Sequence, residues 1–404
     1  MINLLHTADI HIGMENYGRI DSATGFHTRL LDFLNSLDQM VDYAIENCDV
    51  VLISGDIYKV REPNNTHQRE FARRIKRLID NNIPVVLNCG NHDQPNTEGR
   101  ARAIEIYKAL DLPGVYIATK PEIFLIDTKN GPLQIACIPY LSKSFILKKD
   151  EDLTSEQLRD RMRTIIEDIV RSMAQRIDKN LPSVLSAHLS VDNAEVGSEQ
   201  SIMMGSEIVV PTGVIAREEF DYIALGHIHK YQVVHDNPLT VYSGSLDRID
   251  FSEEKEEKGF CHVFIERGSV THKFIPVNTR PFKTIVVEVE EDNPTENILK
   301  EAAKFQLNSS IVRLILKLSQ EANLKIRYKE IAKFFNENSF YFSGISREWK
   351  KRNTLVRDAE ITEKLDPLSA LEKYFLSRGD IKCDKNELLK RAESLYREIL
   401  EGTL

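Results

Sequence analysis

The sequence predicts an α/β protein with a large layered domain, a small α+β unit after it and a pair of helices at the carboxyl end. Over residues 1–280, short aliphatic runs typical of buried strands alternate with helical stretches, which is the pattern of helices layered on a sheet. A shorter alternation of strands and helices begins after Pro281. Two segments with helix-capping residues and apolar stripes end the chain.

Five aliphatic runs have the length and composition of buried strands. They lie at residues 2–5, 50–53, 85–87, 184–185 and 222–225. Between the first three runs, the segments 30–46 and 68–81 have helical character. In the first segment, apolar residues recur at helical spacing, which predicts a helix packed on the sheet.

Polar side chains of metal-binding types follow each of these five runs. In an open α/β sheet, the loops after the carboxyl ends of the strands converge on one crevice, so residues far apart in sequence can meet there. The set holds carboxylates, imidazoles and an amide but no thiolate, which favours Mn²⁺, Fe²⁺, Mg²⁺ or Zn²⁺ over a cysteine-rich structural zinc site. The residues are Asp9, His11, Asp56, Asn91, His92, Asp93, His188, His227 and His229.

A pair of ions would suit this set. Two ions roughly 3.5–4 Å apart clamp an in-line displacement at phosphorus and activate a bridging water. One carboxylate shared by both ions would hold that spacing, and we expect Asp56 to be that group. Glycines at 55, 90 and 226 would let the backbone bend tightly beside the ions. A lone histidine is usually structural, but five such motifs in series favour a metal centre.

The ordered motifs resemble the calcineurin-like metallophosphoesterase superfamily. Within it, the chain is similar to the SbcD nucleases of bacteria and their archaeal and eukaryotic Mre (meiotic recombination) counterparts, which act in DNA double-strand-break repair. Residues 205–211, the turn at 244–246 and the element at 258–260 also look like that family. The resemblance covers residues 1–280 well and the remainder in layout. It implies a layered β-sandwich flanked by helices as the nuclease domain.

The resemblance also implies two divalent ions per chain, with Mn²⁺ expected, and a role for each motif. One ion would be held by Asp9, His11, Asp56 and His229, and the other by Asp56, Asn91, His188 and His227. His92 would stay off the metals and act on the phosphate or leaving oxygen as a general acid or transition-state stabiliser. His227 and His229 are two apart, so in an extended segment both can point to one face, but spacing leaves open which ion each serves.

Lys59 departs from a pattern common in the family. Three residues after the expected bridging Asp56, many relatives carry Asp or His, which can orient the catalytic histidine. A lysine has donors and no acceptor, so it cannot hold His92 as a carboxylate would. It can instead bind a phosphate oxygen as a point charge. Whether Asp93 or another group orients His92 is left open.

Composition restricts the class of protein. The 404 residues predict two or three domains, and 42% hydrophobic with 28% charged residues is typical of a soluble globular protein. No apolar run approaches the ~20 residues of a membrane helix, and the amino terminus lacks the layout of a signal peptide. Five scattered cysteines without a CxxC favour a reduced cytoplasmic interior, and the resemblance implies a nucleoid-associated protein of a prokaryote.

The net charge of −9 weakens any expectation of tight DNA binding by the isolated chain. Phosphate contacts depend on local positive charge, which bound cations or a partner would supply. One basic cluster lies on the helical stretch 68–81, and we interpret it as a solvated outer face. Its members are Arg69, Arg73, Arg74, Lys76 and Arg77.

Residues 281–352 are expected to form a compact α+β unit. Strands are predicted at 284–289, 311–318 and 340–345, with helices at 297–305 and 328–336. The resemblance implies a capping domain that sits beside the active site and shapes its access to DNA. A stability appendage is the alternative.

A basic segment surrounds Trp349, the one tryptophan of the chain. Basic side chains beside an aromatic ring can grip backbone phosphate and stack on a base, although charge runs are more often merely solvated. We therefore hypothesise DNA contacts in this segment, in addition to Lys59. The residues are Arg347, Lys350, Lys351 and Arg352.

A helical hairpin is predicted within residues 360–404. Asp366-Pro367 is a good helix start, and Asp384 with Glu387 forms a candidate capping box. Two short helices bury little surface by themselves, so they dock either on their own chain or on a partner. In the family, such a hairpin grips the coiled-coil base of an SMC-like ATPase, called SbcC in bacteria. The expected contacts are Leu388, Leu395, Tyr396 and Ile399.

Three functions compete on these observations. The leading one, implied by the resemblance, is a Mn²⁺-dependent nuclease subunit, working as a homodimer, with single-strand endonuclease and 3′-to-5′ exonuclease activity at DNA ends, hairpins and breaks. The second is a phosphodiesterase or phosphatase acting on a small molecule or protein, which would need neither capping unit nor hairpin. The third is a non-catalytic scaffold for an ATPase, which the intact set of ligands argues against.

Overall fold

The computed structural model describes residues 1–95, 100–142, 154–195, 197, 208–350, 366–377 and 384–400 of the chain. Contacts divide the chain into two compact units. The first contains Met1–Ile285, Ala302–Leu314 and Lys329–Ile345, and the second contains Val286–Glu301, Ile315–Tyr328 and Ser346–Leu404. Across the described ranges, no helix is both long enough and apolar enough to cross a membrane.

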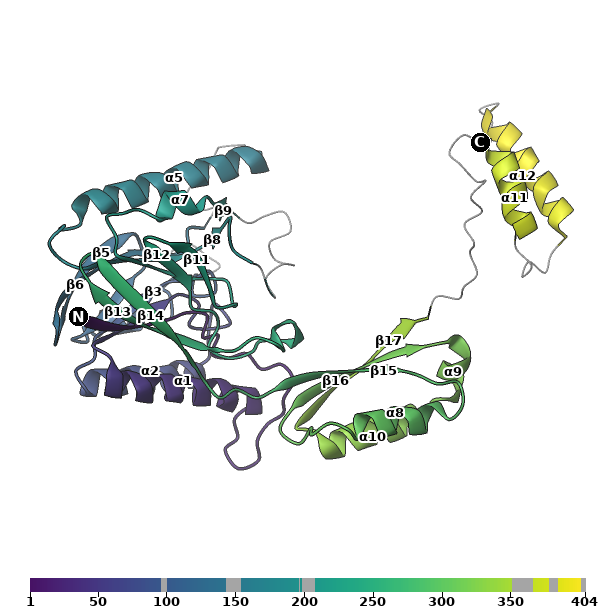
Figure 1. Cartoon of the computed structure of the whole chain (residues 1–404), viewed down its shortest axis with the longest axis horizontal. Coiled ribbons are helices and arrows are strands. Elements are labelled where there is room, and N and C mark those ends of the chain that lie inside the picture. Colours follow the sequence, from purple (N-terminus) through teal and green to yellow (C-terminus); the bar gives the residue numbers. More distant parts are fainter. Residues whose placement is uncertain are drawn as a thin grey trace. The chain divides into compact units, whose positions relative to one another are not determined.

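Two six-stranded sheets form the centre of the first unit (Figure 1). One sheet has the order β14-β13-β1-β2-β3-β4, and β1 to β4 run parallel to one another. The antiparallel strands β13 and β14 complete this sheet on the other side of β1. The bounds are β1 (Ile2–Thr7), β2 (Val50–Ser54), β3 (Val85–Asn88), β4 (Val115–Ala118), β13 (Gly259–Glu266) and β14 (Ser269–Pro276).

The second sheet has the order β11-β12-β10-β7-β6-β5. Its four central strands are parallel, whereas the edge strands β5 and β11 pair antiparallel with their neighbours. The bounds are β5 (Glu122–Thr128), β6 (Gly131–Ile138), β7 (Ser183–His188), β10 (Tyr222–Gly226), β11 (Gln232–Asp236) and β12 (Leu239–Tyr242). The short strands β8 (Ser190–Val191) and β9 (Val209–Val210) pair separately.

The sheets stack face to face and helices cover both outer faces. Successive strand residues point to opposite faces, so Leu4 and Leu52 pack in the apolar core between the sheets, while Leu5 and Ile53 face helices α1 (Thr28–Asn47) and α2 (Asn65–Asp80). On the other side, α5 (Ser155–Arg176) and α7 (Thr212–Ile215) cover the second sheet (Figure 1). The predicted helix-flanked β-sandwich is confirmed.

The basic cluster on α2 is paired with acidic side chains. Arg74 lies 2.5 Å from Asp38 of α1 and 3.1 Å from Glu70. Arg77 also pairs with Asp38, at 3.0 Å, and Glu70 pairs with two further arginines of α2. The cluster therefore links α1 to α2, and much of its positive charge is neutralised.

The α+β part that follows contains a three-stranded sheet with the order β15-β16-β17, and its predicted strands and helices are confirmed. The bounds are β15 (Phe282–Glu288), α8 (Pro294–Ala302), β16 (Ile311–Leu318), α9 (Gln320–Lys325), α10 (Tyr328–Asn338) and β17 (Tyr341–Trp349). Within the first unit, Phe335 of α10 stacks on Phe342 of β17 with ring centroids 4.7 Å apart. Within the second, Thr295 of α8 accepts a hydrogen bond from the Arg327 N–H.

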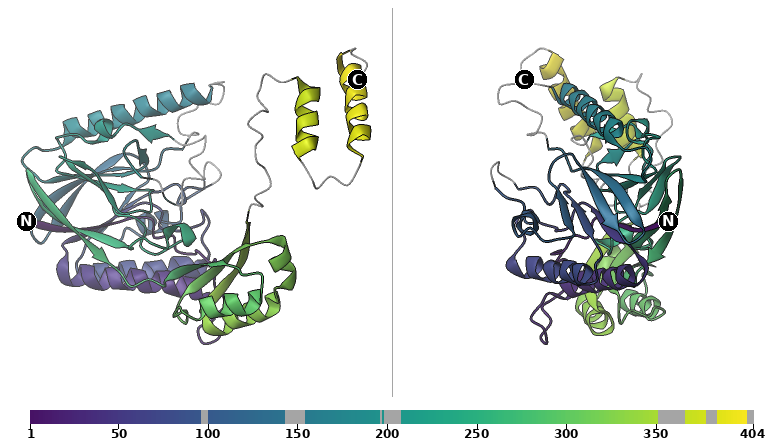
Figure 2. Two further views of the ribbon diagram at one scale, coloured as in Figure 1. Left: turned by 45° about the vertical axis from the view of Figure 1, so that its right-hand side comes forward. Right: turned by 90° about the vertical axis from the view of Figure 1, so that its left-hand side faces the viewer.

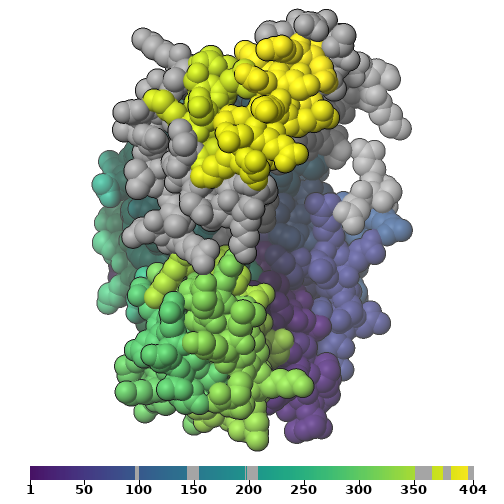
Figure 3. Space-filling view, turned by 90° about the vertical axis from the view of Figure 1, so that its right-hand side faces the viewer, coloured from purple at the N-terminus to yellow at the C-terminus, as the bar shows by residue number. Residues whose placement is uncertain are grey.

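The predicted pair of carboxyl-terminal helices is also present. Helices α11 (Pro367–Ser377) and α12 (Lys385–Leu400) lie side by side (Figures 2 and 3). The Asp366 carboxylate caps α11 by accepting hydrogen bonds from the first turn, and Asp384 caps α12 in the same way, through the Asn386 N–H at 2.9 Å.

Candidate metal centre

The carboxyl ends of five parallel strands, three from one sheet and two from the other, bring the predicted ligands together. His188 is the last residue of β7, and Gly226 ends β10 directly before His227. The loops are joined by hydrogen bonds, since the Asp9 N–H donates to the Gly55 carbonyl at 3.0 Å and the His227 N–H donates to the Asp9 carboxylate at 2.9 Å. The sandwich thus places ligands from both sheets at one edge.

Asp56 lies between two groups of these side chains. Its Oδ2 is 3.8 Å from His11 Nε2, and its Oδ1 is 3.5 Å from His188 Nε2. The two carboxylate oxygens therefore face different histidines. This is the arrangement that a carboxylate shared by two ions needs.

One group lies on the Oδ2 side of Asp56. His11 Nε2 is 3.1 Å from His229 Nε2, and ligand atoms of Asp9, His11 and His229 all lie within 4.8 Å of one another. The other group lies on the Oδ1 side, where Asn91 Oδ1 is 2.9 Å from His188 Nε2 and 3.2 Å from His227 Nδ1. The predicted ligands therefore gather on both sides of Asp56, and ligand atoms of Asp9, Asp56 and His188 also lie within 4.8 Å of one another.

Burial makes this cluster suited to cations. Asp9, His11, Asp56 and His188 are each no more than 2% exposed, and buried carboxylates are seldom found without a compensating charge. Burial, together with the neighbouring Asp56, raises the pKa of Asp9 to about 6. Although burial lowers the pKa of His188, the Asp56 and Asp9 carboxylates and the Ser54 carbonyl together raise it to about 9. Divalent ions would replace these protons, so the donor set fits the two metals.

The backbone around the centre is shaped for close approach. Asp9, His11 and Asp56 all have φ between 50° and 54°, a conformation that is costly for residues with a Cβ and that gathers at functional sites. Gly55 has a φ of 102°, and a Cβ there would overlap the His188 ring. A Cβ on Gly90 would overlap the Asp56 carboxylate. The sequence led us to expect glycines here because the backbone bends tightly. The structure adds a second reason, since a side chain at either position would collide with a metal-binding residue.

His92 lies at the half-buried side of the cluster. Its N–H donates to Asp56 Oδ1 at 2.9 Å, and its ring centroid is 5.2 Å from that of His11. A ring nitrogen of His92 also lies within 4.8 Å of ligand atoms of His11 and Asp56. Burial and the Lys59 charge lower the pKa of His92, against the opposing effect of Asp56.

Asp93 is engaged with backbone groups. Its carboxylate accepts hydrogen bonds from the N–H groups of Ile57 at 3.1 Å and Gly90 at 2.9 Å. The Asp93 carboxylate therefore holds backbone donors of two loops. The backbone of Lys59 lies near the imidazole and opposes the lowering of the His92 pKa.

Three contributors at the centre were missed from the sequence. The Ser54 carbonyl accepts a hydrogen bond from His188 Nδ1 at 2.8 Å, and Glu253 lies 3.0 Å from His229 Nδ1 with Lys258 beside it. A backbone carbonyl leaves no sequence signal. Glu253 and Lys258 stand in a run of charges that resembles a solvated segment, although both side chains are fully buried.

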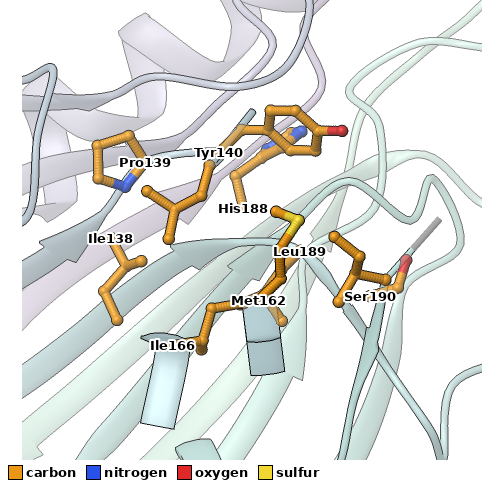
Figure 4. A pocket seen from close by; sticks show the side chains of 10 residues that line it. Ile138, Pro139, Tyr140, Met162, Ile166, His188, Leu189 and Ser190 are labelled. Carbon is orange, nitrogen blue, oxygen red and sulfur yellow. The ribbon is translucent and has the colours of Figure 1, made fainter. Parts of the chain in front are cut away.

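A small cavity adjoins His188 (Figure 4). Its volume is about 30 Å³. The ring of Tyr140 lies over this edge of the centre, with its centroid 6.4 Å from those of His188 and His227. The lining residues are Ile138, Pro139, Tyr140, Leu141, Met162, Ile166, His188, Leu189, Ser190 and Ile208.

The residues predicted to contact DNA or a partner lie in several places. Lys59 is half-buried beside His92. Arg347, Trp349 and Lys350 are exposed at the end of β17, whereas Lys351 and Arg352 lie outside the described residues. On α12, Leu395 is 39% exposed, and Leu388 and Tyr396 are half-buried. The side chain of Ile399 lies outside the described part.

Comparisons with solved structures give distant similarities. The inner membrane complex anchor GAP50 of Plasmodium is 12% identical, with a TM-score of 0.40, and the match covers 68% of this chain and 84% of that one. A dimetal phosphatase from Danio rerio is 10% identical, with a TM-score of 0.38, and the match covers 68% of this chain and 95% of that one.

Residues 2–231 match the family described as calcineurin-like phosphoesterase. The matched segment contains every one of the candidate ligands, from Asp9 to His229. Members of this family are dimetal-dependent hydrolases of phosphoesters, which agrees with the paired arrangement around Asp56. Because the match spans more than half of the 404 residues, the chain belongs to the calcineurin-like phosphoesterase family.

Proposed function

We propose that the chain is the nuclease subunit of a DNA double-strand-break repair complex, with single-strand endonuclease and 3′-to-5′ exonuclease activity that depends on Mn²⁺. The observation that carries the proposal is Asp56, whose two oxygens face His11 and His188 while its Oδ1 also accepts the His92 N–H. The resemblance to the SbcD and Mre nucleases supports DNA as the substrate.

The protein's own groups have distinct tasks in this proposal. Two bound divalent ions would supply an activated water and stabilise charge on the phosphate. His92 lies at the open side of the cluster, where its imidazole can donate a proton to, or stabilise, the departing ribose oxygen. Lys59, beside His92, would bind a phosphate oxygen.

The parts of the chain beyond the family match favour a macromolecular substrate. The α+β part and the α11–α12 hairpin both follow residue 231, and a small-molecule phosphodiesterase or phosphatase needs neither. Arg347 and Lys350 flank Trp349, which is 52% exposed, as phosphate contacts beside a base-stacking ring would be. Residues 281–352 would act as the capping domain, and the active form would be a homodimer.

The catalytic proposal is tested with His92→Ala and Asp56→Ala. His92→Ala should abolish cleavage of DNA ends and hairpins while retaining both metals and DNA binding. Asp56→Ala should lose the metals as well as cleavage. Loss of both metals from His92→Ala would contradict the role given to His92. Turnover of cyclic nucleotides or p-nitrophenyl phosphate that exceeds DNA cleavage would instead favour the small-molecule phosphodiesterase.

The DNA-contact proposal is tested through salt dependence. Each phosphate contact contributes about −0.9 to the slope of log K against log salt concentration on duplex DNA. Replacing Arg347, Lys350, Lys351 and Arg352 with alanine should therefore flatten the slope. An unchanged slope would rule out these contacts.

We further propose that residues 360–404 bind an SMC-like ATPase of the SbcC type through the α11–α12 hairpin. The exposed Leu395 and the half-buried Leu388 and Tyr396 supply apolar surface on α12. Deleting residues 360–404 should abolish co-purification of the ATPase, and Leu395→Glu should weaken it. Glu393→Gln, on an exposed position of the same helix, is the matched control. Full retention of the ATPase after the deletion would refute the proposal.

A further inference from the structure

A fully buried ion pair lies beside the metal centre, in contact with His229. Glu253 ends the short 3-10 helix η1 (Phe251–Glu253), and Lys258 lies directly before β13. The Lys258 Nζ is 2.9 Å from Glu253 Oε2, and neither side chain is exposed to solvent. Buried pairs of this kind often cost more in desolvation than they return in stability, so their presence here calls for a specific role.

Both members of the pair hold His229. Glu253 Oε1 lies 3.0 Å from His229 Nδ1, and the Lys258 ammonium donates to the His229 carbonyl at 3.0 Å. The Ser245 N–H donates to the same carbonyl at 2.9 Å. The ring and the backbone of His229 are thus fixed by one pair of residues.

The remaining hydrogen bonds of the pair are also made. Lys258 donates to Glu256 at 2.7 Å, so its three contacts account for the three donors of an ammonium. Glu253 Oε2 additionally accepts the Ile249 N–H at 3.0 Å. A satisfied network of this kind is rigid, which suits a role in orientation.

We infer that Glu253 and Lys258 are positioning residues that fix His229 with Nδ1 protonated and strengthen its Nε2 as a ligand. A carboxylate accepts hydrogen bonds and cannot donate when ionised, so the proton lies on Nδ1 and the Nε2 lone pair faces His11 and Asp9. Such carboxylate partners raise the basicity of a ligating histidine. The Lys258 ammonium, 2.9 Å from Oε2, pairs with this carboxylate. The inference rests on the metal centre of the proposed function and is independent of the substrate.

A comparison with His188 shows what the Glu253–Lys258 pair contributes to His229. Its Nδ1 donates to the Ser54 carbonyl, at 2.8 Å, so its orientation is fixed by a neutral acceptor. His229 has a charged acceptor instead. Loss of the Glu253 charge should therefore weaken the ion on the His229 side and leave the ion on the His188 side largely unchanged. This asymmetry distinguishes a positioning role from a general loss of stability.

The test compares Glu253→Gln and the double variant Glu253→Gln/Lys258→Met with Asp221→Asn. The double variant removes both charges of the fully buried pair together, so it tests the inference if the single variant fails to fold. Asp221 is a matched control because its carboxylate is also buried and paired, with the Ser183 N–H at 2.8 Å and Arg267 at 2.6 Å. Asp221 directly precedes β10, whereas His227 directly follows that strand. Loss of the Asp221 charge therefore acts at the end of the sheet opposite the metal centre.

Three measurements are made on the full chain: Mn²⁺ binding at each site by calorimetry and electron paramagnetic resonance, the His229 tautomer by ¹⁵N NMR, and the melting temperature with EDTA. Changes in partners of ligating histidines typically cost 10–100-fold in metal affinity. We expect a loss of about 10-fold or more at one of two sites in both Glu253 variants, with Asp221→Asn unchanged. In the double variant, the one amide oxygen faces either His229 Nδ1 or the Ile249 N–H, and the ¹⁵N spectrum shows which. A loss of affinity with Nδ1 still protonated reports the charge alone.

Wild-type affinity at both sites in both Glu253 variants would overturn the inference, even if their melting temperatures fell as in Asp221→Asn. Equal weakening of both sites would overturn it as well. If the wild-type chain itself bound no Mn²⁺, the proposed function would fall together with it. The outcomes are therefore distinguishable without any measurement of cleavage.

Discussion

The Asp93 carboxylate accepts a hydrogen bond from the Ile57 N–H at 3.1 Å, and this contact ties the loop that carries His92 to the loop that carries Asp56. The same carboxylate accepts from the Tyr58 and Gly90 N–H groups. Asp93 is 2% exposed, so water has little access to these donors. One side chain thus sets the spacing between a bridging ligand and the proposed catalytic histidine.

Asp93→Ala should therefore destabilise the protein and loosen the metal centre. The change leaves three buried N–H donors without their acceptor, and each unsatisfied buried group costs about 1–3 kcal/mol. We expect a loss of about 3 kcal/mol or more in the free energy of unfolding, measured by urea denaturation with EDTA. Asp93→Asn retains one accepting oxygen and should lose less. A loss below about 1 kcal/mol in Asp93→Ala would contradict this account of the loops.

Metal affinity should rise with pH. Burial and Asp56 raise the pKa of Asp9 to about 6, and Asp56 raises the pKa of His188 to about 9 against the effect of burial. Both groups must lose their protons to act as ligands. Protons therefore compete with the metal increasingly as the pH falls through about 9 and then about 6.

Calorimetry checks this pH dependence. Mn²⁺ titrations between about pH 5.5 and 8.5, in buffers of different ionisation enthalpy, should show increasing affinity and the release of protons on binding. His188→Gln should reduce the number of protons released near neutral pH. An affinity that stays constant over this range would mean that neither group holds a proton in the metal-free protein.

The arginines of α2 should become available to DNA when Glu70 is removed. Glu70 pairs with Arg69, Arg73 and Arg74, and two of these arginines are more than half exposed. Because solvent screens such pairs, Glu70→Ala should cost about 1 kcal/mol of stability. Non-specific DNA binding should strengthen, with a slope against log salt steeper by about one phosphate contact.

Filter binding over a range of salt concentrations measures this effect. Glu167→Ala is the control, because Glu167 pairs with an arginine on the other covering helix, α5. It also removes one negative charge from a helix surface, so it separates a local effect from a change in net charge. If DNA binding strengthened equally in Glu70→Ala and Glu167→Ala, the change in net charge alone would explain it.

How much the sequence could predict depended on whether the signal was local. Strands such as β1 and β2 and helices such as α1 follow from short apolar patterns, and parallel strands place their carboxyl ends together whatever the details of the loops. The candidate ligands therefore met as expected. By contrast, β11 and β14 are half-exposed edge strands without a continuous apolar run, and they were not predicted.

The groups that support the ligands were beyond the reach of sequence patterns. Glu253 lies 24 positions from His229, and no periodicity links a buried acid in a charged run to a distant histidine. The Ser54 carbonyl binds His188 whatever side chain that position carries. Arg74 and Asp38 are 36 positions apart in the sequence, and they pair only because α1 and α2 pack against each other. Each of these contacts exists only after the fold has formed.

Gly90→Ala should dismantle the metal centre while leaving the fold in place. A Cβ at position 90 would overlap Asp56 Oδ1 and the Asp56 backbone nitrogen. Neither atom can move freely, because Asp56 Oδ1 accepts the His92 N–H and the Asp56 carbonyl accepts the His11 N–H. Overpacking of this kind typically costs about 1–3 kcal/mol, and here the strain falls on the bridging ligand.

Gly213→Ala is the matched control for this variant. Gly213 lies in α7, and a Cβ there meets nothing within 4 Å. It should therefore leave metal binding unchanged and raise stability by about 0.5–1 kcal/mol. We expect Gly90→Ala to lose high-affinity binding of at least one of two Mn²⁺ ions, measured by calorimetry, with its circular dichroism spectrum retained. Two ions bound at wild-type affinity would show that Asp56 does not need the space beside residue 90.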